Sequence, residues 1–124
     1  MSAIHQLSRC APWLEAALEH AGGTHTIDDV IREIYTGKLQ FWPGDRSAIV
    51  TEIEYYPLMK SCHFFLAGGD LQEIEQMTPR IEAWAKGQGC KRMSLAGRRG
   101  WERTFLAGDG YKPRWYVMAK ELGS

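Results

Sequence analysis

The stretch FLAGGDLQEIEQMTPRIEAW, residues 65–84, joins an apolar run to a helical pattern through two consecutive glycines, Gly68 and Gly69. After these glycines, apolar residues recur at the three- and four-residue spacing of a helix. A helix N-terminus can bind phosphate, because its first N–H groups are unpaired and the positive end of the helix dipole lies there. Here the first turn carries Asp70 and Glu73. The sequence therefore predicts that the chain caps this helix with its own carboxylates.

Before this stretch, the sequence alternates with the two-residue period of a β-strand. Residues 47–56 place Ile49 and Val50 on opposite faces, and residues 60–66 alternate in the same way. In the latter run, one face is predicted to carry Cys62, Phe64 and Leu66 and the other Ser61, His63 and Phe65. Turn residues separate these runs from each other and from residues 39–42. We expect three strands joined as an antiparallel meander.

The other expected elements are strands at residues 4–8, 92–95 and 111–122, helices at 11–20, 26–37 and 71–84, and a short helical turn at 97–106. Pro79 lies inside the third helix, so either a kink or a restart is expected there. The order β-α-α-β-β-β-α-β-α-β predicts an α+β fold, an α/β sandwich with a mixed, mostly antiparallel central sheet and helices on both faces. The length of 124 residues predicts a single domain over residues 1–124.

The composition, 44% hydrophobic and 24% charged, is that of a soluble globular protein. We expect no membrane span, since no apolar run approaches about 18 residues, and no secretory signal, which predicts a cytoplasmic protein. Three cysteines without a CxxC pair favour reduced thiols. No metal is expected, because His20 and His25 lack companion ligands in the sequence.

The net charge of zero is divided unevenly along the chain. Residues 86–124 contain nine Lys and Arg against three acidic residues, a net charge of +6, and residues 1–85 carry −6. This asymmetry is typical of two solvated faces of opposite sign, or of a surface that binds an anion or a partner.

The element order and the stretch IEAWAKGQGCKRMSLAGRRGWERTFLAGDGYKPRWYVMAKEL, residues 81–122, resemble the GNAT superfamily, the Gcn5-related N-acetyltransferases. The family's second half has a helix ending in Ala, a Gly, a strand, a short helix, a Gly-aromatic pair and a last strand. Ala85, Gly89, Leu95 and Gly110-Tyr111 match these places. Small divergent members of this kind also occur among phage and prophage genes.

The resemblance implies transfer of an acyl group from acetyl-CoA to a small-molecule amine, with no metal. It implies that the cofactor lies along the opened edge of a central strand and at the following helix N-terminus. In this sequence that segment is Phe65, Leu66, Ala67, Gly68 and Gly69.

Two departures from the family pattern affect this implication. The family's two phosphate-loop glycines would fall near Gln72 and Ile74, so the pyrophosphate loop is degenerate. The tyrosine that protonates the leaving thiolate in many members is replaced by Leu106, which has no proton to donate.

Glu52, Glu54 and His63 are the candidate catalytic bases. A buried glutamate or a histidine could deprotonate an acceptor ammonium. The alternative is a polar strand face near solvent for the two glutamates, and a hydrogen-bonded structural role for His63.

Arg98 and Arg99 lie among glycines and are candidates for binding a phosphate, including the 3′-phosphate of CoA or nucleic acid. The alternative is a solvated loop.

Two main hypotheses for function follow. The first is an acyl-CoA-dependent N-acyltransferase with a degenerate pyrophosphate loop. The second is a catalytically silent GNAT-like binding or structural protein, such as a phage virion or accessory protein, for which a protein partner or self-association is expected. Nucleic-acid binding through the basic C-terminal part has the least support. Fold alone does not decide between these hypotheses.

Overall fold

The structure is a computed structural model that describes residues 2–96, 104–115 and 117–123. These residues contain four helices and four strands. In chain order they are α1 (Ala3–Leu18), α2 (Ile27–Thr36), β1 (Leu39–Pro43), β2 (Ser47–Tyr55), β3 (Lys60–Gly69), α3 (Leu71–Gly87), β4 (Cys90–Leu95) and α4 (Phe105–Gly108).

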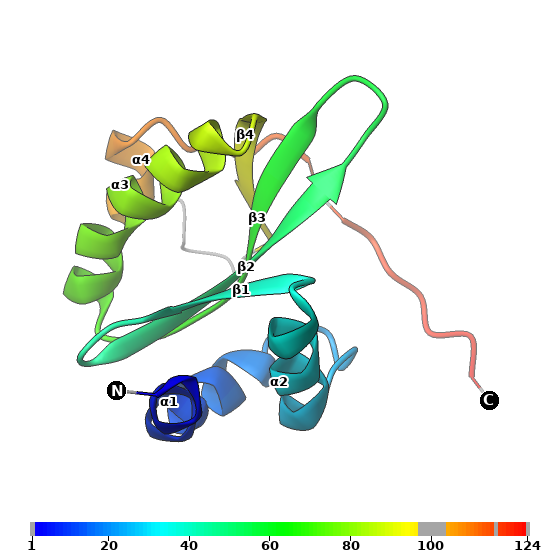
Figure 1. Cartoon of the computed structure of the whole chain (residues 1–124). Coiled ribbons are helices and arrows are strands. Elements are labelled where there is room, and N and C mark those ends of the chain that lie inside the picture. The colour runs from blue at the N-terminus through cyan, green and yellow to red at the C-terminus, as the bar shows by residue number, and fades with distance from the viewer. Residues whose placement is uncertain (1, 97–103, 116, 124) are drawn as a thin grey trace.

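The four strands form one mixed sheet in the order β1-β2-β3-β4. β1 pairs antiparallel with β2, β2 pairs antiparallel with β3, and β3 pairs parallel with β4 across the helical connection α3. Figure 1 shows α1 and α2 on one face of the sheet and α3 with α4 on the other. The predicted α+β fold, with a mostly antiparallel sheet and helices on both faces, is confirmed.

Each face of the sheet has its own apolar core. The core under α1 and α2 consists of Cys10, Leu14, Val30, Leu39, Ala48, Val50 and Leu66. The core under α3 consists of Ile49, Ile74, Met77 and Ile81. Ile49 and Val50 thus enter opposite cores, as the two-residue alternation of β2 predicts.

The N-terminus of α2 is capped as its sequence predicts. The Thr26 side chain accepts a hydrogen bond from Asp29 N, and the Asp29 carboxylate accepts one from Thr26 N. These hydrogen bonds, together with the Arg32 guanidinium, lower the pKa of Asp29 to about 2. At the other end Gly37 has φ 86°, a left-handed conformation that glycine adopts without a steric cost.

The prediction of a strand at residues 4–8 is wrong, because these residues form the first turns of α1. The side chain of Ser2 caps the helix by accepting a hydrogen bond from His5 N. Leu7, Cys10 and Leu14 are buried on one helical face, so burial extends the helix toward the N-terminus. Pro12 is inside the helix but exposed, where water can reach the carbonyl that its missing N–H leaves without a partner.

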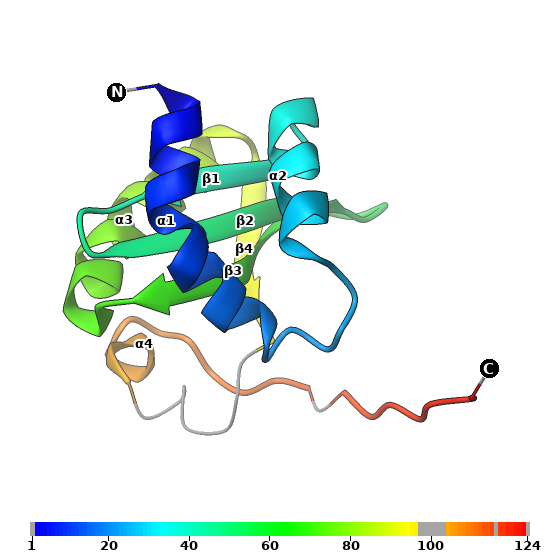
Figure 2. The same ribbon diagram turned by 90° about the horizontal axis from the view of Figure 1, so that it is seen from below.

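The prediction of a strand at residues 111–122 is also wrong for the residues that the structure describes. They belong to no sheet: Tyr111 packs against Phe64, and Figure 1 and Figure 2 show the last part of the segment running away from the folded body. Pro113 removes one hydrogen-bond donor, and an isolated strand has no stability without a partner. Of the predicted helical turn at 97–106, residues 97–103 lie outside the described residues, and Phe105 and Leu106 form the start of α4.

α3 continues through Pro79 as one helix, so a restart at this position is wrong. The Thr78 hydroxyl donates to Ile74 O at 2.9 Å and satisfies one carbonyl of the turn before the proline. Figure 1 shows α3 changing direction along its length, as an interior proline predicts.

Replacing Leu14 by Ala should destabilise the protein by about 2–5 kcal/mol, because it leaves a cavity in the core under α1 and α2. The matched control is Leu58→Ala, since Leu58 is 93% exposed and its loss should change stability by no more than about 0.5 kcal/mol. Urea unfolding of both variants measures the difference. Equal losses in the two variants would contradict the position of the core.

Candidate functional site

β3 extends beyond its pairing with β4. The parallel pairing runs from Lys60 opposite Cys90 to Phe64 opposite Leu95. β3 then continues to Gly69, still paired with β2 on its other side. Along residues 65–69, one backbone edge of β3 therefore faces no strand among the described residues.

A β-bulge lies at the point where β3 leaves β4. The register with β2 changes from Phe64 opposite Thr51 to Leu66 opposite Val50, so Phe65 is the extra residue. Phe65 and Leu66 consequently both pack against the core under α1 and α2, whereas Phe64 and Ala67 pack under α3. The predicted continuous alternation of residues 60–66 is thus wrong at Leu66. A bulge bends its strand and increases its twist, which accounts for the divergence of β3 from β4.

The loop between α1 and α2 contacts the bulge on the sheet face that these two helices cover. The imidazole of His25 lies 4.8 Å from the ring of Phe65, measured between ring centres. The predicted cofactor segment Phe65–Gly69 thus has an unpaired backbone edge on one side and a loop against its first side chain.

The N-terminus of α3 is filled by the chain's own groups. Asp70 is the N-cap, and its carboxylate accepts a hydrogen bond from Glu73 N at 3.3 Å. Glu73 Oε1 accepts hydrogen bonds from Arg46 N, at 2.8 Å, and from the Ser47 hydroxyl. The Arg46 guanidinium lies 3.2 Å from Asp70 Oδ2 and 3.8 Å from Glu73 Oε2. This network bears out the self-capped helix that the sequence predicts.

The hydrogen bonds from Ser47 and Arg46 hold the pKa of Glu73 below its usual value, against the opposing effect of burial. Glu73 is therefore a fixed negative charge within the first turn of α3. It lies where a bound pyrophosphate would approach.

The glycines near this helix end serve close packing of the chain against itself. A Cβ on Gly68 would lie 2.4 Å from Trp13 O, and one on Gly44 would lie 2.2 Å from Glu73 Oε1. Gly69 has φ 106°, and a Cβ there would lie 2.4 Å from Arg46 O. These contacts explain Gly68 and Gly69 without a phosphate.

His63 stands at the centre of a polar cluster on the sheet. Its Nδ1 lies 2.9 Å from Ser94 Oγ, a hydrogen bond whose direction depends on the tautomer, and 4.0 Å from Glu54 Oε1. Glu52 lies directly across from His63 in the register of β2 and β3. The three predicted bases are thus on one sheet face, although only Glu54 and His63 have a direct contact in the described residues.

The cluster can exchange protons but does not form a nucleophilic triad. A serine relay needs its hydroxyl and its carboxylate on different imidazole nitrogens, whereas Ser94 and Glu54 both approach Nδ1. Within the described ranges no hydrogen bond engages Nε2 of His63. In the tautomer whose Nδ1–H donates to Ser94 Oγ, Nε2 can receive a proton from a bound ammonium.

Tyr111 lies on the opposite side of the sheet from His63. Its ring is 6.4 Å from that of Phe64, which packs under α3, and its hydroxyl donates to Glu82 Oε2 at 2.5 Å. Burial, with the added effect of Glu82, raises the pKa of Tyr111 well above its usual value. The Tyr111 ring thus packs on the α3 side of the sheet with its hydroxyl bound to Glu82, and the nearby Leu106 is buried.

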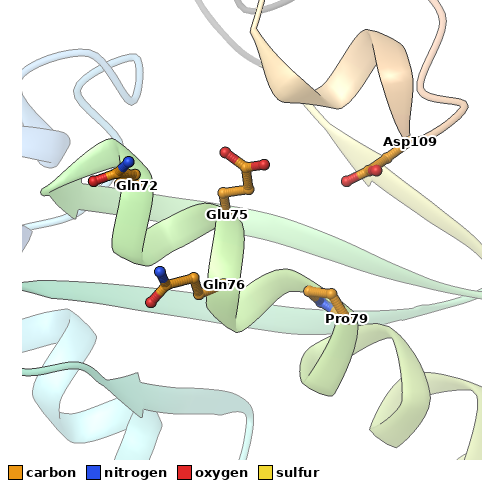
Figure 3. Close-up of a pocket in the computed structure, with 5 residues that line it drawn as sticks. All are labelled: Gln72, Glu75, Gln76, Pro79 and Asp109. Atoms are coloured by element: carbon orange, nitrogen blue, oxygen red, sulfur yellow. The ribbon is translucent and has the colours of Figure 1, made fainter.

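The structure also has a polar groove of about 370 Å³ along α3 (Figure 3), which contains no predicted site residue. It is lined by Gln72, Glu75, Gln76, Pro79 and Asp109. No group of three His, Cys, Asp or Glu that could hold a metal ion occurs in the described ranges. Within the same ranges, every helix is too short or too polar to cross a bilayer. Arg98 and Arg99 lie outside the described residues.

Solved structures with a similar arrangement include one described as a possible acetyltransferase and one described as an N-acetyltransferase. The chain superposes on a "possible acetyltransferase" from Clostridium difficile 630 with a TM-score of 0.68 and 12% identity, covering 99% of this chain and 95% of that one. The chain has the GNAT fold.

A second GNAT-fold neighbour is glucosamine-6-phosphate N-acetyltransferase from Arabidopsis thaliana, with a TM-score of 0.57 and 15% identity over 88% of this chain and 90% of that one. A mutant protein from Thermus thermophilus superposes with a TM-score of 0.61 and 11% identity over 90% and 92% of the two chains. No protein-family model and no curated protein sequence matches this chain. At these identities the likeness establishes the fold alone.

Replacing Glu73 by Gln should lower the melting temperature at neutral pH, because the ionised carboxylate binds Ser47 and Arg46 better than an amide does. The folded-state pKa is depressed, so the ionised form stabilises the fold above the unfolded pKa, and this contribution is lost as pH falls through the folded pKa. The difference in melting temperature between the parent protein and the variant should therefore shrink on acidification.

The matched control is Glu75→Gln, because Glu75 is an exposed acid on the same helix. Thermal melts from about pH 7 down to about pH 3 measure both variants. A constant difference across this range would show that the charge of Glu73 does not contribute.

Alkylation should distinguish the three thiols. Burial raises the pKa of Cys62 to about 11 and also raises that of Cys10, and both side chains are fully buried, whereas Cys90 is half-buried. Since the thiolate is the reactive form, Cys90 should react first with iodoacetamide in the native protein, and all three should react in denaturant. Peptide mass spectrometry measures the order, and early labelling of Cys62 would contradict its burial.

Proposed function

We propose that this protein is an acyl-CoA-dependent N-acyltransferase. The observation that carries the proposal is the divergence of β3 from β4 at the Phe65 bulge, immediately beside the cluster of His63 and Glu54. A backbone edge that can hold an extended amide-containing chain thus lies next to groups that can accept a proton. The acetyltransferases among the structural neighbours support this proposal.

Only part of acetyl-CoA fits the residues of this site. The backbone N–H and C=O groups along residues 65–69 can pair with the amides of pantetheine, as a further strand would. The pyrophosphate does not fit the α3 N-terminus in the same way, because the Asp70 carboxylate already accepts from Glu73 N and the Glu73 carboxylate adds a second negative charge in the first turn. We therefore propose that affinity comes chiefly from the pantetheine arm and that the nucleotide adds little.

The proposed chemistry requires a neutral amine to attack the thioester carbonyl. His63, or Glu54 directly or through water, removes the proton from the acceptor ammonium, and Glu52 on the same face adds negative charge that attracts it. Ser94 holds the imidazole through Nδ1 and so leaves Nε2 for the acceptor. The C–N bond forms and the C–S bond breaks, and the proton that the attacking nitrogen then loses protonates the leaving thiolate, so the cofactor leaves as a thiol.

Calorimetric titration with acetyl-CoA, CoA and pantetheine, supported by melting scans, tests the proposal. Acetyl-CoA at about 100 times its dissociation constant should stabilise the fold by about 2.7 kcal/mol. CoA and pantetheine should bind with similar affinity if the pyrophosphate is not held. His63→Gln should lower kcat about 10²–10⁴-fold without changing acetyl-CoA affinity.

The matched control for His63→Gln is His20→Gln, because His20 is exposed at the end of α1. It should leave both kcat and affinity unchanged. Absence of heat and of a melting shift at millimolar acetyl-CoA would overturn the transferase proposal.

The filled N-terminus of α3 favours a second candidate function, a catalytically silent GNAT-like protein that binds a protein partner or associates with itself. The exposed apolar side chains of the C-terminal segment, Trp115, Val117, Met118 and Leu122, favour a partner as well. A phage virion or phage-accessory protein belongs to this class, and a cytoplasmic location suits the transferase. Sedimentation of the purified protein, with and without residues 112–124, tests self-association.

A further inference from the structure

We propose that the amine acceptor also carries an anionic group, a carboxylate or a phosphate, which Arg92 binds. This inference rests on the proposed transferase function. It comes from two rows of polar side chains that cross β2, β3 and β4 on one sheet face. The register defines the rows as Glu52–His63–Ser94 and Glu54–Ser61–Arg92.

The two rows lie on the same face of the sheet. Met93 packs under α3, so its neighbours Arg92 and Ser94 point to the opposite face. Ser94 Oγ contacts His63 Nδ1 and lies 3.5 Å from Ser61 Oγ, which places the β4 and β3 side chains together. Glu52, Glu54, His63, Arg92 and Ser94 are all half-buried and remain reachable by a ligand.

The sign of charge reverses across the rows. The carboxylates stand on β2 and the guanidinium of Arg92 stands on β4, two strand spacings or about 10 Å away between backbones. Ser61, between them, is buried and uncharged, and its hydroxyl donates to Arg92 O at 3.3 Å. An extended ligand with an ammonium at one end and an anion at the other matches this pattern.

A second cation strengthens the positive end. The guanidinium carbons of Arg92 and Arg114 lie 5.2 and 5.5 Å from the ring centre of Trp115. In the described ranges, the salt bridges formed by arginines involve Arg32 and Arg46, and none involves Arg92 or Arg114. Two like charges on one indole, with no carboxylate paired to either in the part of the chain that the structure describes, favour binding of an anion there.

A matched set of acceptors tests the inference. The probes are 5-aminopentanoate, 4-aminobutyl phosphate and pentylamine, each offered with acetyl-CoA. The anionic amines should have a KM about ten-fold or more below that of pentylamine, because a charge-assisted bidentate hydrogen bond is lost with the neutral chain. The anionic amine with the lower KM shows whether Arg92 prefers to bind a carboxylate or a phosphate.

Arg92→Gln should raise the KM for the preferred anionic amine to that of pentylamine and leave kcat and acetyl-CoA affinity unchanged. The matched control is Lys91→Gln, which removes the same charge from an exposed neighbour on β4 and should leave all three unchanged. Equal KM values for the three amines in the parent protein would overturn the inference while the transferase proposal stands.

Binding of the same probes without acetyl-CoA, measured by ligand-observed NMR, separates the two proposals. If no amine is acylated but the anionic amines bind and Arg92→Gln abolishes binding, the anion site stands and the transferase proposal fails. Absence of both acylation and binding at millimolar probe would overturn both.

Discussion

The carboxylate of Glu73 joins two parts of the chain that lie far apart in the sequence. It binds Arg46 N and the Ser47 hydroxyl at the start of β2, and the adjacent Asp70 N donates to Arg46 O at 2.9 Å. These bonds fix the point at which the chain leaves β3 and turns into α3. Because α3 is the connection to the parallel strand β4, its starting point determines how α3 crosses the sheet and where β4 aligns beside β3.

The same interaction limits the chemistry of the site. The buried carboxylate of Glu73 in the first turn of α3 complements the helix dipole, while the N-cap Asp70 satisfies the N–H group of Glu73. It also opposes a second anion in the same place. For the proposed cofactor, the unpaired edge of β3 would favour binding of the amide chain, and the carboxylates at the start of α3 would oppose binding of the pyrophosphate. A transferase with this arrangement would depend less on the nucleotide than on the thioester arm.

The elements that are predictable from the sequence are those with local signals. The alternation of β2, the capping box of α2 and the acidic start of α3 are all contained in a few neighbouring residues. Residues 4–8 resemble a strand because a run of five residues of mixed polarity fits the two-residue period of a strand as well as the period of a helix. The burial of Leu7 on the packed face of α1 favours the helix, and this burial is visible only in the folded structure. The segment at 111–122 has strand-forming residues, but a strand also requires a partner edge, which a local pattern does not reveal.

The candidate site is predictable in its residue types and not in its contacts. His63, Glu54 and Glu52 are recognisable from strand positions and side-chain chemistry. Ser94 gives no signal of its own, because serine on a short strand is common, and only the parallel register places it beside His63. Arg46 lies in a turn 24 residues before Asp70, so its contacts with the start of α3 cannot be inferred from spacing.

The bulge at Phe65 decides which face of the sheet carries the imidazole. Leu66 and Val50 face the core under α1 and α2, and in a regular strand the odd-numbered His63 would point the other way, into the apolar layer beneath α3. β2 has no extra residue, so Glu52 and Glu54 stay in phase with Val50. The one extra residue in β3 thus exchanges the sheet faces of the β3 side chains that precede it. As a result, His63 lies on the same face as the two glutamates. Deleting a single residue at this point would leave the composition of the site intact and separate its base from its carboxylates by the thickness of the sheet.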